Sequence, residues 1–113
     1  MPHYLIQFTY TPRSIQGLID RPDVDHAEQA SGLVRSLGGN LLGYWYAFGH
    51  FDGIVLIEAP DHSVPAAVAM AVGATGEVSR LETTVLLTTD EARVAMRKAG
   101  TATHLPPGEK GSR

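Results

Sequence analysis

The residues best suited to chemistry lie around one predicted hairpin. His50 and Asp52 are two positions apart between apolar segments, and Arg80 lies near the start of the last predicted strand. Histidine titrates near neutral pH, a neighbouring carboxylate can orient its ring, and a guanidinium can hold a carboxylate or an oxyanion. We therefore predict His50 and Asp52 as catalytic residues for proton transfer on a small organic molecule, which needs no cofactor.

Residues that bind the ligand are predicted beside this pair. Trp45 and Tyr46 offer flat apolar walls to an aromatic molecule. Because the first two strands of the predicted sheet run the same way, their ends share one rim with the starts of the last two. The predicted ligand-binding residues at or just below this rim are Gln7, Thr9, Trp45, Tyr46 and Arg80.

Each of these residues also has a purely structural interpretation. His50 at the tip of a hairpin can simply be exposed, and Asp52 can pair with Arg80 or accept a backbone N–H near the turn. Trp45 and the tyrosines can belong to a core or an interface. The other histidines are dispersed without the usual ligand spacing, so we expect neither a metal site nor a cofactor.

Composition restricts the class of protein. A chain of 113 residues predicts one domain. Its nine Lys and Arg are scattered and its net charge is −3, so neither nucleic acid nor an anionic membrane is expected as a partner. The absence of cysteine excludes disulfides and thiolate metal sites. Without a signal peptide or an apolar run of membrane-spanning length, we expect a cytoplasmic protein.

Helix start signals recur between the apolar segments. Thr11, followed by Pro12, begins a short helix; Asp25 and Thr88 begin two others, each with Glu three positions later as in a capping box. Strands are predicted over 3–10, 40–48, 51–58 and 78–87, and helices over 13–19, from Asp25 to Gly38-Gly39, from about 63 to 74, and from 88 to about 98.

The order of these elements predicts an α+β fold. It is the ferredoxin-like β-α-β-β-α-β pattern, with a four-stranded antiparallel sheet, helices on one face, and an added C-terminal helix. A single domain is predicted over 1–98. Residues 99–113 contain little apolar content and are predicted to form a flexible tail.

The central hairpin sets which side chains share a face. Gly49-His50 fits a two-residue type II′ turn, which would pair Tyr46 with Gly53. A register slip of one residue would exchange the faces. In this register one face carries Leu42, Tyr44, Tyr46, Phe48, Phe51, Val55 and Ile57, and the other carries Trp45, Ala47, Asp52, Ile54, Leu56 and Glu58.

The uncovered face of the sheet predicts self-association. Its residues in the first strand, His3, Leu5, Gln7 and Thr9, form a mixed set that is too apolar for free contact with water and too polar for a core. The helix over 63–74 is apolar nearly all round, as in helices buried on several sides. We expect a homodimer or larger oligomer in which two sheets face each other and enclose a cavity; the alternative is a monomer with an Ala-rich surface helix.

Several segments together resemble a known family. MPHYLIQFTYTP, SLGGNLLGYWYAFGHFDGIVLIEAPD, the Ala-rich helix and TTVLLTTDE are similar to GYD-domain proteins, small bacterial proteins named for a glycine, an aromatic residue and an aspartate. Here the motif reads Gly49-His50-Phe51-Asp52, with phenylalanine in place of the tyrosine. The resemblance covers about residues 2–92 and implies the ferredoxin-like fold of the dimeric α/β-barrel group.

Two functions remain open at this point. The first is a binder of a small apolar or aromatic molecule, with cofactor-free proton transfer as a further possibility. The second is a non-enzymatic oligomer with a structural or regulatory role. The group that the family resembles contains enzymes of several kinds as well as stress-response proteins, and a fold does not determine a reaction.

Overall fold

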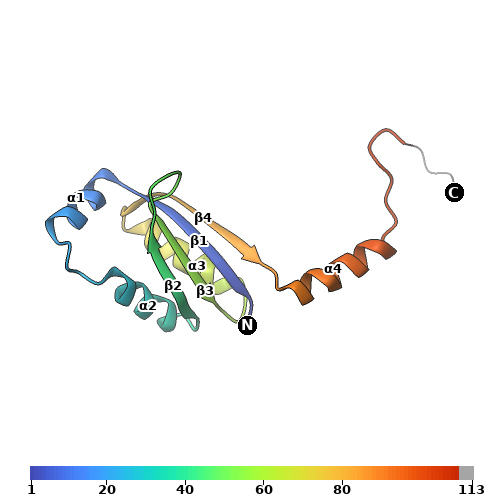
Figure 1. Ribbon diagram of the computed structural model, residues 1–113, viewed down its shortest axis with the longest axis horizontal. Coiled ribbons are helices and arrows are strands. Elements are labelled where there is room, and N and C mark those ends of the chain that lie inside the picture. Colours follow the sequence, from blue (N-terminus) through green and yellow to red (C-terminus); the bar gives the residue numbers. More distant parts are fainter. Residues whose placement is uncertain (110–113) are drawn as a thin grey trace.

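A regular alternation of apolar side chains makes β1 (His3–Tyr10) the centre of the sheet. The computed structural model describes residues 1–109. β1 buries Tyr4, Ile6 and Phe8 on one face and lies between β3 (Gly53–Glu58) and β4 (Val78–Leu86). β2 (Asn40–Tyr46) pairs with the outer side of β3, and all three pairings are antiparallel (Figure 1). The predicted four-stranded antiparallel sheet is confirmed.

Helices connect the strands as the predicted ferredoxin-like pattern requires. α1 (Pro12–Asp20) and α2 (His26–Ser36) together link β1 to β2, and α3 (Ser63–Ala74) links β3 to β4. Val34 of α2 and Val68 of α3 join Tyr4, Ile6 and Ile57 in one buried core. The core therefore lies between these two helices and one face of the sheet, and no helix within residues 1–109 packs on the opposite face.

The predicted helix starts have a clear physical basis. Thr11 and Asp25 each accept a backbone N–H from the residue three positions later, and Pro12 occupies the first helical position, where its missing N–H costs nothing. Thr88 and Glu91 form the complete predicted capping box of α4 (Thr89–Thr101). At α3 the N-cap residue is His62, which makes no side-chain capping bond, and the carboxylate of the preceding Asp61 accepts the Ser63 N–H.

α4 continues the chain away from the body of the protein (Figure 1). It ends three residues beyond the predicted position, and none of its residues is buried. Residues 102–109 contain no helix or strand. The predicted tail over 99–113 therefore begins inside this helix, and its last four residues, 110–113, lie outside the described part; its flexibility stays a prediction.

The two edge strands, β2 and β4, each contain a bulge, and the bulge in β2 changes which side chains share a face from those predicted. Leu41 pairs with Ile57 and Gly43 with Leu56, so Leu42 is an extra residue in β2. This bulge turns Leu41, rather than the predicted Leu42, toward the core, and leaves Leu42 45% exposed. A second bulge at Ser79 of β4 lies where Thr9 pairs with Arg80 but Tyr10 pairs with Val78.

The hairpin keeps its predicted register but not its predicted turn. Tyr46 pairs with Gly53, as expected. However, Gly49 has a φ of 158°, whereas a type II′ turn needs about +60° at this position. The last hydrogen bond of the hairpin runs from Ala47 N–H to the carbonyl of Asp52 at 2.8 Å, so the connection is a wider loop.

Membrane-spanning helices are not found among residues 1–109, since no helix there combines sufficient length with sufficient apolar character.

Candidate functional site

The structure brings part of the predicted site together at one rim of the sheet. Thr9 lies opposite Arg80 on neighbouring strands. The Arg80 guanidinium donates to His50 Nε2 at 2.9 Å and forms an ion pair with Glu82. Because arginine can only donate, His50 accepts through Nε2 and carries its proton on Nδ1. His50 is therefore oriented by Arg80 rather than by Asp52.

Phe51 anchors this rim and does not share the face of Val55 and Ile57 on which the predicted register placed it. The ring is only 8% exposed, yet it lies outside the core cluster. The His50 ring meets it edge-on with centroids 4.9 Å apart, and the Arg80 guanidinium lies 5.1 Å from its centroid in a cation–π contact. The wider loop allows Phe51 to leave the alternation of β3 and to pack under these two side chains.

The carboxylate of Asp52 is hydrogen-bonded to the backbone of β1. Its Oδ2 accepts the N–H of Tyr10 at 2.9 Å, and its own N–H donates to the carbonyl of Phe8 at 2.9 Å. Asp52 thus extends the pairing of β3 with β1 by one step, with a side-chain oxygen replacing a backbone acceptor. Among the described residues, no hydrogen bond joins Asp52 to His50, so the predicted catalytic pair is not formed in this arrangement.

The other predicted binding residues are divided between the two faces. Gln7 lies opposite Ile54 and Glu82 on the uncovered face. Trp45 lies on that face also; its ring covers Gly43 and is 53% exposed. Tyr46 lies on the opposite face, 56% exposed, with its ring edge-on to Tyr44. Trp45 and Tyr46 therefore cannot form two walls of one pocket.

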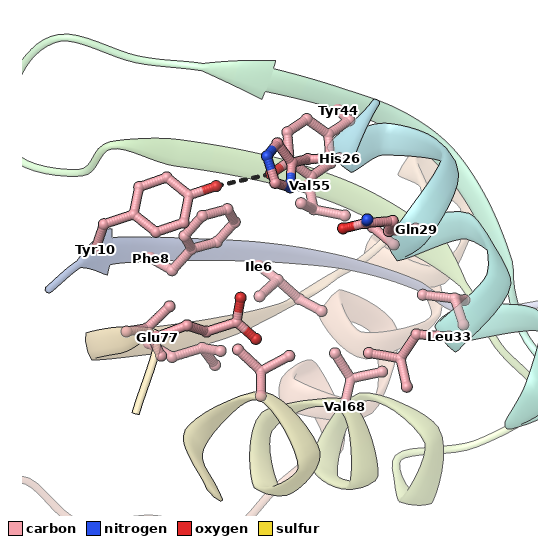
Figure 2. Close-up of a pocket in the computed structure, with 15 residues that line it drawn as sticks. Ile6, Phe8, Tyr10, His26, Gln29, Leu33, Tyr44, Val55, Val68 and Glu77 are labelled. Atoms are coloured by element: carbon pink, nitrogen blue, oxygen red, sulfur yellow. Dashed lines mark hydrogen bonds between the residues drawn. The ribbon is translucent and has the colours of Figure 1, made fainter. Parts of the chain in front are cut away.

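A cavity lies on the other side of the sheet, under α2 and α3. Its volume is about 170 Å³ (Figure 2). Apolar side chains from all four strands and both helices form most of its wall, and a few polar groups lie among them. The lining residues that matter below are Phe8, Tyr10, His26, Gln29, Ala30, Tyr44 and Glu77.

Two tyrosine hydroxyls meet at the edge of this cavity. The Tyr10 and Tyr44 oxygens are 3.0 Å apart and form a hydrogen bond, drawn as a dashed line in Figure 2. Burial raises the pKa of Tyr44 far above its ordinary value and raises the pKa of Tyr10 as well, with the charge of Glu77 acting in the same direction. Both phenols are therefore neutral hydrogen-bonding groups at physiological pH.

The motif at the hairpin supports the wall of this cavity. Asp52 fixes the backbone of Tyr10, and Phe8 lies with its ring across Gly53, where a Cβ would overlap it. The Phe8 ring meets the Tyr10 ring edge-on at 5.2 Å. The Asp52-Gly53 pair thus positions two aromatic residues of the cavity from the neighbouring strand.

A second, more open recess of about 310 Å³ lies next to the cavity beneath α1. The recess and the cavity share four lining residues, which form a polar collar between them. These collar residues are Tyr10, His26, Gln29 and Glu77.

The sequence contains only a weak signal for this site. His26 and Gln29 are spaced i, i+3 with Ala30 and Leu33, which places them on the inner face of α2. Such a spacing is equally typical of a helix that only packs on a sheet. Among residues 1–109, no group of three His, Asp or Glu side chains could hold a metal ion together.

Comparisons with known proteins concern mainly the fold. No curated protein matches the chain. The crystal structure of FFRP-DM1 is similar over 77% of this chain and 100% of its own, with a TM-score of 0.52 and 11% identity. An uncharacterized NIPSNAP domain protein from Burkholderia xenovorans is similar over 79% of this chain and 95% of its own, with a TM-score of 0.50 and 14% identity. At such identities the similarity demonstrates a shared fold and no shared activity.

The sequence itself gives a more specific relationship. The GYD domain matches residues 4–96, from β1 into α4, which includes the whole sheet and the hairpin motif. The chain belongs to the GYD domain family.

Proposed function

We propose that the protein binds a small, largely apolar molecule with one ring in the cavity under α2 and α3. The volume of the cavity carries this proposal: an apolar protein cavity of about 150 Å³ is known to accept benzene, and this one is slightly larger. Phe8, Tyr10 and Tyr44 supply aromatic walls against which a planar ring can pack. The ligand class agrees with the one expected from the sequence, but the site differs.

The tyrosine pair would give such a ligand its orientation. Two hydroxyls carry two hydrogens, and the bond between Tyr10 and Tyr44 uses one of them. The other hydrogen is available to an oxygen on the ligand. A ring with a hydroxyl or carbonyl substituent therefore fits this site better than a plain hydrocarbon, because a buried polar group gains from every partner it finds.

Proton transfer on the bound molecule remains a further proposal. His50 and Asp52, the predicted catalytic residues, lie at the rim. There His50 accepts a hydrogen bond from Arg80, and Asp52 accepts one from the Tyr10 N–H. Asp52 would act on the cavity through Tyr10, as a positioning residue. His26 lines the cavity itself and is the histidine whose location suits direct proton exchange with a ligand there.

Filling the cavity is expected to abolish binding. In Ala30→Leu the longer side chain would project from α2 into the space needed by a ring, and leucine is well tolerated in a helix. Phenol and toluene can serve as probes, with binding followed by saturation-transfer NMR. We expect phenol to bind more tightly than toluene to the natural protein, and neither to bind Ala30→Leu.

A matched control makes this test specific. Ala99→Leu introduces the same change on the exposed surface of α4 and should leave binding intact. Equal binding of phenol to Ala30→Leu and to the natural protein would contradict the proposed site.

We also propose that the chain forms a homodimer or larger oligomer with a structural or regulatory role, and its exposed area favours the association. The chain exposes 7889 Å², whereas a compact protein of its mass, 12.1 kDa, exposes about 6,000 Å². The excess of roughly 1,900 Å² is comparable to the area buried in a standard interface. An isolated helix as short as α4 is only marginally stable in water, so contacts with a second copy would stabilise it.

The mass of the full chain in solution tests this second proposal. Light scattering at micromolar concentration should give at least twice the mass of one chain, independent of added phenol. A monomer under these conditions would rule out the oligomer and leave the cavity proposal standing, because every cavity residue comes from one chain.

A further inference from the structure

The collar between the cavity and the outer recess contains one carboxylate. Glu77, immediately before β4, lines both spaces, and Figure 2 shows its carboxylate directed into the cavity. No other Asp or Glu of the described chain lines either space. Arg21 lines the outer recess but not the cavity. The collar therefore presents the negative charge of Glu77 to a ligand that passes from the recess into the cavity.

Within residues 1–109, no cationic side chain lies within ion-pair distance of this carboxylate. Its one side-chain partner there is the Thr75 hydroxyl, which donates to Oε1 at 3.1 Å. None of the ion pairs in this part of the chain includes Glu77. A carboxylate can accept several hydrogen bonds, so most of its capacity is available to a bound molecule.

The surroundings favour a positive charge over a negative one. The faces of the Phe8, Tyr10 and Tyr44 rings carry partial negative charge and attract cations. The charge of Glu77 reaches these tyrosines, because it contributes to the raised pKa of both Tyr10 and Tyr44. An anionic group at the same place would be repelled by the carboxylate of Glu77.

We propose that the ligand is an arylalkylamine, with one aromatic ring in the cavity and a protonated amine on a short chain at the Glu77 carboxylate. This inference rests on the proposed function of the cavity and adds the charge of the ligand. The ammonium group would donate to the free oxygen positions of Glu77 while the ring packs against the side chains of Phe8 and Tyr44 that line the cavity. Charge-assisted hydrogen bonds of this kind are about twice as strong as neutral ones.

Three probes that share a ring and differ in their polar end test the charge. Phenethylamine, 2-phenylethanol and 3-phenylpropionate are compared by calorimetric titration of the full chain. We expect the amine to bind about tenfold more tightly than the alcohol, and the carboxylate to bind most weakly. In Glu77→Gln the preference for the amine over the alcohol should fall below about threefold.

Two controls keep the result interpretable. Glu82→Gln removes a carboxylate from the uncovered face, where it pairs with Arg80, and should keep the full preference. Glu77→Gln retains the backbone carbonyl that accepts from Thr11 and Ser14, so its thermal unfolding should match that of the natural protein.

The possible failures differ from one another. If the alcohol or the carboxylate binds as tightly as the amine, or if Glu77→Gln keeps the preference, the amine assignment is overturned while the cavity stands. If none of the three probes binds and Ala30→Leu changes nothing, the proposed function itself fails, and the amine assignment with it.

Discussion

Replacing Gly53 with alanine is expected to lower the free energy of unfolding by about 1–3 kcal/mol. A Cβ at this position would overlap the ring of Phe8. That ring is 7% exposed and packs edge-on against Tyr10, so it cannot turn away without disturbing the cavity wall. Urea unfolding followed by circular dichroism measures the loss, and phenol binding should weaken in parallel.

Gly43→Ala provides the matched control. A Cβ at Gly43 would overlap the Trp45 ring just as severely, but that ring is 53% exposed and can swing into solvent. Both substitutions introduce alanine into a strand, so they differ mainly in how freely the overlapping ring can move. We expect Gly43→Ala to cost less than about 1 kcal/mol and to alter the fluorescence of Trp45, the one tryptophan in the sequence. Equal losses for the two variants would refute this steric explanation.

Removing the carboxylate of Asp52 should cost about 2 kcal/mol of stability, because a hydrogen bond to a charged group contributes about 1.5–3 kcal/mol. Asp52→Ala leaves the Tyr10 N–H without its acceptor, whereas Asp52→Asn keeps an oxygen at the same place. We expect the asparagine variant to lose less than about 1 kcal/mol. Urea unfolding of the two variants gives these values.

Hydrogen exchange at one amide separates the structural role of Asp52 from a catalytic one. Exchange of the Tyr10 N–H should accelerate strongly in Asp52→Ala and only slightly in Asp52→Asn. A proton-transferring carboxylate would behave differently, since asparagine cannot replace it in turnover. If both variants keep the slow exchange of Tyr10, the contact does not stabilise the end of β1.

Local signals in the sequence account for most of the fold. The alternation in β1, the caps at Thr11 and Asp25, and the Thr88–Glu91 capping box depend on residues close together in the chain, and all of them are confirmed. The register Tyr46 with Gly53 also follows from local pattern. These features could be predicted because each has its own short-range cause.

Features that depend on distant neighbours were missed. Leu42 and Ser79 become bulges through pairing with strands elsewhere in the chain, and an extra residue reverses the face of everything beyond it. The type II′ turn was wrong because the hairpin closes at Ala47 and Asp52, while Asp52 also pairs with β1, which leaves a wider loop between them. The cavity depends on how far α2 and α3 lie from the sheet, which no single segment determines.

The bulges also affect how the sheet can grow. β2 and β4 are its two outer strands, and each contains one bulge, whereas the pairing of the central strands β1 and β3 is unbroken. An outer strand with a regular backbone is a template on which a strand of another molecule can add, and repetition of that step leads to fibrils. A bulge twists the backbone and interrupts the row of free donors and acceptors. The bulges in β2 and β4 therefore hinder the addition of further strands at both edges of the sheet, and with it the growth of fibrils.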